Sequence, residues 1–137
     1  MSPSYRSTPL QILLIEDDAT INSVLKVYVD LYFKTENVTL VSSLREGLAY
    51  LKTIQVDLVL TDFYFSDGNA IPIINRVNEL NPKPKLVITS GMRDPSATLQ
   101  GLVFDDFIPK PYNLDQVAEV MSRMLNVQVV CAETSEA

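Results

Sequence analysis

The chain has 137 residues, of which 47% are hydrophobic and 20% are charged, as is typical of one globular domain. Its formal net charge of −6 argues against a nucleic-acid partner, because binding to phosphates requires a basic surface. A single cysteine, Cys131, and the lack of histidine exclude an internal disulfide, cysteine or histidine metal clusters, and Ser-His catalysis.

Short apolar runs alternate along the chain with stretches of helical periodicity. The apolar runs predict strands over residues 12–15, 38–41, 56–61, 86–89 and around 107–108. The stretches between them predict helices over 19–33, from 44, from 71, near 95–102 and from 114. Asp18, Ser43 and Asn113 are the expected N-caps of the first, second and last helices.

Apolar residues spaced three and four apart indicate which face of each helix turns inward. In the first helix they are Ile21, Val24, Leu25, Tyr28, Leu31 and Tyr32. The second helix is expected to bury Leu44, Leu48 and Leu51. The third carries Ile71, Ile74, Val77 and Leu80, and the last carries Leu114, Val117, Met121 and Met124.

The strand runs are continuously apolar, which is typical of strands that are buried on both faces. Five such strands alternating with five helices predict an α/β fold with a doubly wound, five-stranded parallel sheet. We expect a flexible segment over 1–9, one domain over 10–126, and a tail over 127–137 with no second domain after the last helix. No apolar run approaches a membrane span of roughly 20 residues, and residues 1–9 lack a signal-peptide core, so we expect a cytoplasmic protein without a membrane partner.

Polar groups follow four of the predicted strands, at the edge of the sheet where such folds place their functional crevice. They are Glu16-Asp17-Asp18, Asp62, Thr89-Ser90-Gly91 and Pro109-Lys110-Pro111. Taken singly, each has an ordinary structural explanation, such as a helix cap, a turn or a surface charge. Because four strand ends bring carboxylates, a hydroxyl and an ammonium to one crevice, a shared site is the better interpretation.

The expected chemistry of this crevice is Mg²⁺-dependent phosphoryl transfer. Several neighbouring carboxylates cannot all stay ionised without a cation, and hard oxygen ligands suit Mg²⁺. Such an ion would keep Asp62 ionised and nucleophilic. Phosphoryl transfer depends mainly on positioning and electrostatic stabilisation, which Lys110 and the Ser90 hydroxyl would supply.

The chain resembles the response-regulator receiver family, which includes the chemotaxis response regulator, over about residues 10–125. The matching motifs are ILLIEDD (12–18), DLVLTD (57–62), SDGN (66–69), KLVITSG (85–91) and DDFIPKP (105–111). The resemblance implies a flavodoxin-like (βα)5 fold. It also implies a signalling module rather than an enzyme, whose chemistry is limited to its own phosphorylation and dephosphorylation.

The resemblance assigns a role to each residue of the crevice. Glu16 and Asp17 become the acidic pair that binds Mg²⁺ with Asp62, the phosphoacceptor. The resemblance further implies that Tyr64 offers its backbone carbonyl to the metal and that Ser90 is the switch hydroxyl. It also makes Phe107 the switch aromatic. Lys110 becomes the phosphate-binding lysine, and the peptide bond from it to Pro111 is expected to be cis. The implied partners are a sensor histidine kinase or phosphotransfer protein and an output protein that binds the face of the fourth helix, fifth strand and fifth helix.

Three positions depart from the family pattern and concern the output surface rather than the acidic pocket. Ser66 stands where proline is common, and Val103 and Phe104 replace small residues. The resemblance further places Tyr64 and Met92 beside the path by which water attacks the aspartyl phosphate. Neither side chain carries a carboxylate or amide to orient that water.

Three other functions were weighed against the receiver interpretation. An aspartate-nucleophile phosphohydrolase of the haloacid dehalogenase type needs a second aspartate where Tyr64 stands. A nucleotide or flavin binder needs a phosphate loop after the first strand, where the residues Glu16-Asp17-Asp18 would repel phosphate. A degenerate receiver that binds partners without phosphorylation remains an alternative, because the output face is altered.

Overall fold

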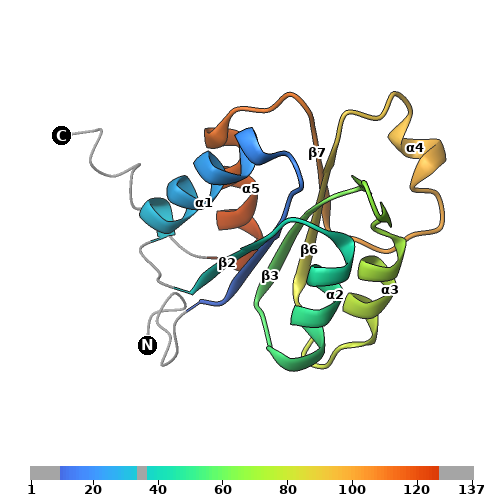
Figure 1. Ribbon diagram of the computed structural model, residues 1–137, viewed down its shortest axis with the longest axis horizontal. Helices are drawn as coiled ribbons and strands as arrows, with labels where there is room; N and C mark the ends of the chain where they lie inside the picture. Colours follow the sequence, from blue (N-terminus) through green and yellow to red (C-terminus); the bar gives the residue numbers. More distant parts are fainter. Residues whose placement is uncertain (1–9, 34–36, 127–137) are drawn as a thin grey trace.

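A computed structural model describes residues 10–33 and 37–126, and these residues form a three-layered α/β unit (Figure 1). The central sheet contains five parallel strands in the order β2-β1-β3-β6-β7. Its strands are β1 (Ile12–Ile15), β2 (Val38–Val41), β3 (Leu58–Asp62), β6 (Lys85–Ser90) and β7 (Asp106–Pro109). The doubly wound order confirms the predicted fold class, and it places β1 between β2 and β3.

Helices cover both faces of the sheet. The helices α1 (Ala19–Phe33) and α5 (Leu114–Leu125) lie on one face, and α2 (Leu44–Thr53) and α3 (Ile71–Glu79) lie on the other (Figure 1). The short α4 (Pro95–Thr98) stands beyond β6, apart from these layers (Figure 1). None of the helices in the two described stretches is long and apolar enough to cross a membrane. The predicted segments 1–9 and 127–137 lie outside the described residues.

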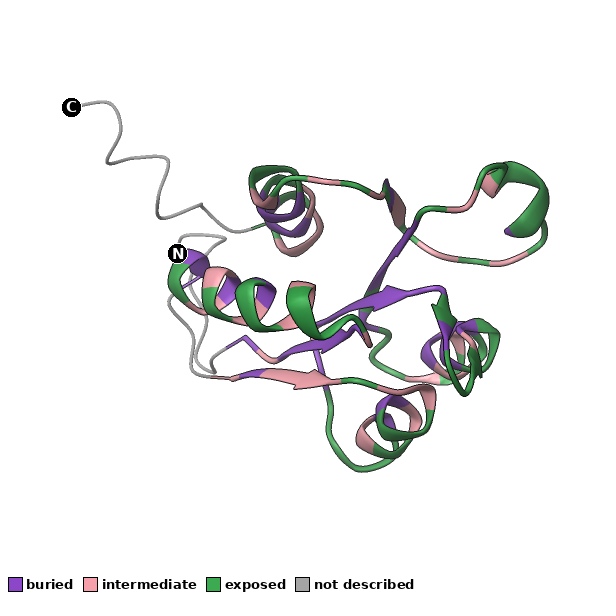
Figure 2. Ribbon diagram, turned by 45° about the horizontal axis from the view of Figure 1, so that its top comes forward, coloured by how far each residue is buried: buried purple, intermediate pink, exposed green. Residues whose placement is uncertain are grey.

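The central strands β1, β3 and β6 are buried along almost their whole length, whereas the edge strands β2 and β7 are mostly half-buried (Figure 2). Side chains of the central strands alternate between two apolar cores, one on each face of the sheet. On β1, Ile12 and Leu14 pack toward α1 and α5, whereas Leu13 and Ile15 pack toward α2 and α3. At the strand ends the apolar side chains give way to buried polar ones, including Glu16, which lie where the prediction placed the crevice.

The helices differ from the prediction in which apolar residues they bury. Helix α1 buries Val29 and Phe33, whereas Val24 is 54% exposed and Leu31 is 69% exposed. Apolar residues occur on more than one side of this helix, so their spacing alone does not identify its inner face. Leu44 and Leu48 in α2 and Leu114 and Met124 in α5 are only partly buried, while Ile71 in α3 is exposed. Helix α4 is also shorter than predicted, since a turn replaces its expected continuation to residue 102.

Candidate functional site

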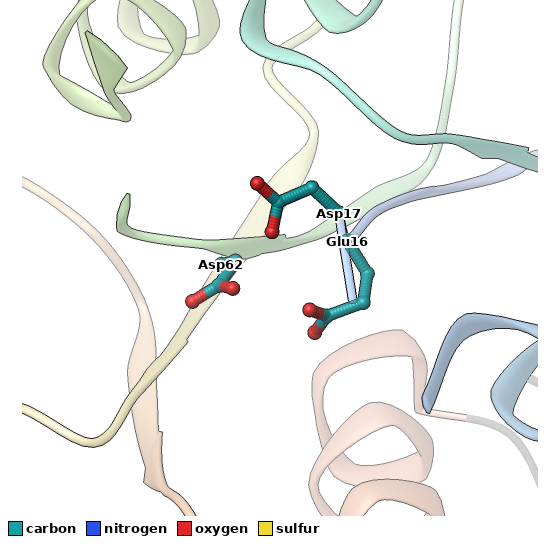
Figure 3. Close-up of side chains that lie close together, drawn as sticks. All are labelled: Glu16, Asp17 and Asp62. Atoms are coloured by element: carbon teal, nitrogen blue, oxygen red, sulfur yellow. The ribbon is translucent and has the colours of Figure 1, made fainter. Parts of the chain in front are cut away.

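Three carboxylates meet at the carboxyl ends of two neighbouring strands. Glu16 and Asp17 directly follow β1, and Asp62 is the last residue of β3, which pairs with β1. One oxygen from each carboxylate lies within 4.8 Å of the other two. Figure 3 shows Glu16 and Asp17 leaving the end of β1 in different directions, with the Asp62 side chain beside them at the end of β3. The sheet therefore brings together the three acidic side chains predicted from the sequence.

Lys110 supplies the positive charge of this site. It follows β7, and its Nζ lies 3.0 and 3.2 Å from the two Glu16 oxygens and 3.1 Å from Asp62 Oδ2. The peptide bond from Lys110 to Pro111 is cis, as predicted. The ammonium thus bridges carboxylates that are 94 and 48 residues away in sequence.

Burial and charge repulsion oppose the ionised form of Glu16. Burial raises the pKa of Glu16, the charge of Asp62 raises it further, and contacts with Lys110 only partly counter this shift. Burial also opposes the charge of Lys110, but its hydrogen bonds to Glu16 and Asp62 outweigh burial and raise its pKa. With three carboxylates and one ammonium, the site carries an excess of acidic groups over basic ones.

The donor set of this site fits a small divalent cation. All three side chains offer hard carboxylate oxygens, and their spacing lets one ion contact all three. Asp62 uses its Oδ1 to accept the N–H of Phe63 at 2.9 Å, and Asp17 uses its Oδ2 to accept the N–H of Ser66 at 3.1 Å. These bonds orient the carboxylates and leave Asp17 Oδ1 without a hydrogen-bond partner among the described residues. Burial and, after it, the charge of Asp62 raise the pKa of Glu16, and a cation at this site would favour its ionised form.

The remaining predicted site residues lie around this cluster. Ser90 is the last residue of β6 and directly follows Thr89, which pairs with Asp62. The Ser90 hydroxyl accepts a hydrogen bond from the N–H of Met92 at 3.2 Å. Phe107 lies on β7 opposite Ile88 and is half-buried. Tyr64 is 53% exposed, and its ring packs edge-on against Phe63 with 4.9 Å between centroids.

A small antiparallel hairpin, which the sequence analysis had interpreted only as a turn, connects the acidic cluster to α2. It consists of β4 (Tyr64–Phe65) and β5 (Gly68–Asn69). The Ser66 N–H binds the Asp17 carboxylate. The neighbouring Asp67 carboxylate accepts the N–H groups of Leu44 and Arg45 at 3.0 and 3.1 Å. These bonds place a negative charge at the N-terminus of α2, where the helix dipole favours it.

We expect Asp67→Asn to flatten the loss of stability at acidic pH. The N–H groups of Leu44 and Arg45 hold the pKa of the Asp67 carboxyl below its ordinary value of 3.8. A lowered folded-state pKa contributes stability above pH 3.8, and this contribution disappears as the pH falls through the folded pKa. Urea unfolding between about pH 5 and pH 2 measures the slope. Equal slopes for the two proteins would contradict the expectation, and Glu119→Gln, on an exposed position of α5, controls for the lost charge.

Tyr112 is a neighbour of the acidic cluster that the sequence analysis did not identify. Its hydroxyl is buried without a hydrogen-bond partner among the described residues. Burial raises the pKa of Tyr112 to about 12, and the charges of Glu16 and Asp62 add to this shift. Its position two residues after Lys110 was the available signal in the sequence.

The fold and the acidic trio together define a receiver-type signalling module, and known proteins agree with this class. The model of the response regulator receiver domain matches residues 12–122. The cell cycle response regulators CtrA of Brucella ovis and Brucella anthropi are each 29% identical over 112 residues. Both matches cover 79% of this chain but 47% of the relative, so the chain spans about half the length of the curated relatives it matches.

Solved receiver structures share the fold. A CheY-like receiver domain protein from Methanospirillum hungatei superposes with a TM-score of 0.77 at 23% identity, covering 87% of this chain and 95% of the other. A response regulator receiver protein from Sinorhizobium medicae superposes with a TM-score of 0.76 at 25% identity, covering 88% and 98%. The chain belongs to the response-regulator receiver family and is a receiver domain of two-component signalling.

Proposed function

We propose that this receiver domain, over residues 10–126, works as a phosphorylation switch in which Asp62 accepts a phosphoryl group. The observation that carries the proposal is the placement of Asp62 beside two other carboxylates, with the Lys110 ammonium 3.1 Å from its Oδ2. A nucleophilic carboxylate, an acidic cation site and a fixed positive charge are the components that phosphoryl transfer requires. The phosphohydrolase alternative needs a second aspartate at position 64, where this sequence has Tyr64.

The phosphoryl donor is proposed to be the phosphohistidine of a sensor kinase or phosphotransfer protein. An Asp62 oxygen forms a bond to phosphorus, the phosphorus–nitrogen bond breaks, and its electron pair leaves with the imidazole. Glu16, Asp17 and Asp62, with the Tyr64 carbonyl, would hold Mg²⁺, which when bound neutralises charge on the phosphoryl oxygens. Lys110 provides a second positive charge, and the Ser90 hydroxyl donates a hydrogen bond to a phosphoryl oxygen.

Incubation with acetyl phosphate and Mg²⁺ tests the proposal. Intact-mass measurement is expected to show one phosphoryl increment in the wild type and none in Asp62→Ala. The control Glu119→Gln removes a carboxylate on the exposed side of α5 and is expected to keep the increment. A wild-type protein that gains no phosphoryl group from acetyl phosphate or from a phosphorylated phosphotransfer protein would instead favour a phosphorylation-independent interaction module.

Phosphorylation is expected to change the position of Phe107, through which the output face of α4, β7 and α5 would respond. Phe107 is half-buried and lines a cavity of about 390 Å³ with residues around α4: Pro95, Ser96, Leu99, Leu102 and Phe104. This free volume lies beside the Phe107 ring, which is expected to reorient when the Ser90 hydroxyl moves toward a phosphoryl oxygen. Structures with and without the phosphoryl mimic beryllofluoride measure the change. The same Phe107 rotamer and α4 position in both structures would contradict the switch.

A further inference from the structure

A cavity of about 210 Å³ lies at the end of the sheet opposite to the acidic cluster. It is lined by the ends of α2 and α3 and by the segments that lead from them into β3 and β6, at the lower end of the view in Figure 1. Val56 lines it before β3 begins at Leu58, whereas Asp62 of the acidic cluster is the residue at which β3 ends. The proposed phosphorylation of Asp62 does not use this cavity, so its lining needs a separate explanation.

The lining of the cavity combines an apolar wall with a few polar side chains. The wall consists of aliphatic side chains and prolines: Leu51, Ile54, Val56, Leu80, Pro82 and Pro84. The polar side chains are Lys52, Thr53, Gln55, Arg76 and Asn81. Within the described stretches of the chain, no carboxylate belongs to the lining. An apolar pocket with a few well-placed polar groups is the usual form of a small-molecule site.

The Arg76 side chain is half-buried and its hydrogen-bonding groups are poorly used. Its Nε is inaccessible to solvent and has no hydrogen-bond partner among the described residues. Its ion-pair partner, Glu79, is 69% exposed, and Oε1 lies 3.7 Å from Nη1, too far for a hydrogen bond. Removing water from a guanidinium without supplying an acceptor is unfavourable. Because charges attract more strongly where water is partly excluded, an anion gains more beside Arg76 than beside an exposed arginine.

Further positive charges surround the cavity, although the whole chain has a net charge of −6. Lys52 lines the cavity and has no ion-pair partner in the part of the chain that the structure describes. Lys83 and Lys85 are exposed on either side of a lining proline. The neighbouring acids Asp57 and Glu79 do not line the cavity, and Asp57 accepts the N–H of Gln11 at 2.8 Å. A cleft lined by one sign of charge attracts ligands of the opposite sign.

We propose that this cavity binds a small organic acid, whose carboxylate pairs with Arg76 and Lys52 and whose apolar body contacts the wall. The planar guanidinium of arginine matches the geometry of a carboxylate. The cavity is smaller than the roughly 300–1,000 Å³ of sites for drug-sized ligands, so the acid is a small one. Inorganic phosphate is a poorer match, because it offers no apolar surface to the wall. The site goes beyond the proposed phosphorylation switch and does not depend on it.

The cations have a second possible role, because Lys52 and Arg76 lie in the last turns of α2 and α3, where positive charge balances the helix dipole. That role requires no ligand, so a binding measurement separates the two explanations. Benzoate is added to the isotope-labelled, Mg²⁺-free full chain, and NMR follows the backbone amides. The signals of Thr53, Gln55 and Asn81 are expected to shift in a saturable way, with a Kd on the order of 1 mM.

Two other probes test the chemical class of the ligand. Benzamide has the same shape as benzoate without its charge, and it is expected to bind on the order of tenfold more weakly. Phosphate has the charge without the apolar ring, and it is expected to cause no saturable shift at these amides. If either probe binds as tightly as benzoate, the cavity does not recognise an organic acid and the inference is wrong.

The variant Arg76→Gln is expected to weaken benzoate binding on the order of tenfold, the effect of one charged hydrogen bond. Lys52→Gln, at an exposed position, is expected to change the affinity in the same direction. Arg123→Gln is the matched control, because it removes a positive charge from an exposed position of α5 and should bind benzoate like the wild type. If benzoate causes no saturable shift in the wild type, or if Arg123→Gln loses as much affinity as Arg76→Gln, the two cations serve only the helix ends and the inference is wrong.

Discussion

Saturating Mg²⁺ is expected to raise the unfolding temperature of this receiver domain by on the order of 10 °C. A ligand at about 100 times its Kd stabilises the folded state by about 2.7 kcal/mol if it does not bind the unfolded chain. The structural reason is the cluster of Glu16, Asp17 and Asp62, whose oxygens lie within 4.8 Å of one another with only Lys110 to balance them. Asp17→Ala is expected to remove most of this gain, because it deletes one ligand and one charge.

The gain from Mg²⁺ is also expected to depend on pH. Burial and the charge of Asp62 raise the pKa of Glu16 above its ordinary value of 4.5. The folded state therefore binds the Glu16 proton more tightly than the unfolded state. In the metal-free protein the tighter proton binding by Glu16 stabilises the folded state below pH 4.5. This contribution to stability is lost as the pH rises through the folded pKa of Glu16. Because Mg²⁺ competes with that proton, the stabilisation by Mg²⁺ should grow as the pH rises through the folded pKa of Glu16 and should vanish in acid.

Differential scanning calorimetry with Mg²⁺ and with a chelator, over a series of pH values, measures this dependence. Subtracting the two curves at each pH removes the contributions of carboxylates outside the cluster, such as Asp67. Glu119→Gln removes one negative charge from an exposed position and is expected to retain the full gain. An unfolding temperature that does not respond to millimolar Mg²⁺ at neutral pH would contradict the predicted metal site.

The phosphorylated state is expected to be long-lived. Replacing Tyr64 by Asn together with Met92 by Glu should shorten its lifetime by about 10²-fold, the low end of what water-positioning groups contribute. The family resemblance places both side chains beside the path of the attacking water. Neither carries a group that orients water, so hydrolysis lacks this assistance. Tyr64 is 53% exposed with its ring against Phe63, and Met92 packs partly into the core of the α2–α3 face.

The decay of the phosphoryl mass increment after removal of acetyl phosphate measures this lifetime. Tyr64→Phe with Met92→Leu is the matched control, because it keeps the bulk at both positions without adding a water-orienting group. The control is expected to decay like the wild type. If the Asn and Glu variant decays no faster than its parent, then access and orientation of water at these two positions do not limit hydrolysis.

The sequence predicted the sheet and the acidic trio because both depend on patterns that are strong locally. The run Ile12–Ile15 is apolar throughout, as is typical of a strand buried on both faces, and Glu16 follows it directly. Once the sheet order is known, the carboxyl ends of β1 and β3 must be adjacent. The same sheet order places β7, and with it Lys110, at that edge of the sheet with only β6 between it and β3, although 48 residues separate Lys110 from Asp62.

The features that escaped prediction depend on contacts that no local pattern encodes. The strands β4 and β5 have two residues each, too few for an alternation to be recognised. Asp67 resembles an ordinary turn residue until the fold brings it to the start of α2. Likewise, nothing in the sequence indicates that the Tyr112 hydroxyl is buried without a hydrogen-bond partner among the described residues. The exposed Val24 could not be distinguished from a core residue by spacing alone.

The β4–β5 hairpin limits how this molecule tolerates changes in length. Surface loops usually accept inserted residues at little thermodynamic cost. Here consecutive residues serve two different anchors, since Ser66 binds Asp17 and Asp67 binds the first turn of α2. A residue added between Ser66 and Asp67 cannot preserve both registers, so it would release either the acidic cluster or the helix start. Tags and reporter loops are therefore better placed elsewhere, and a scan of insertions should find this turn as intolerant as a buried strand.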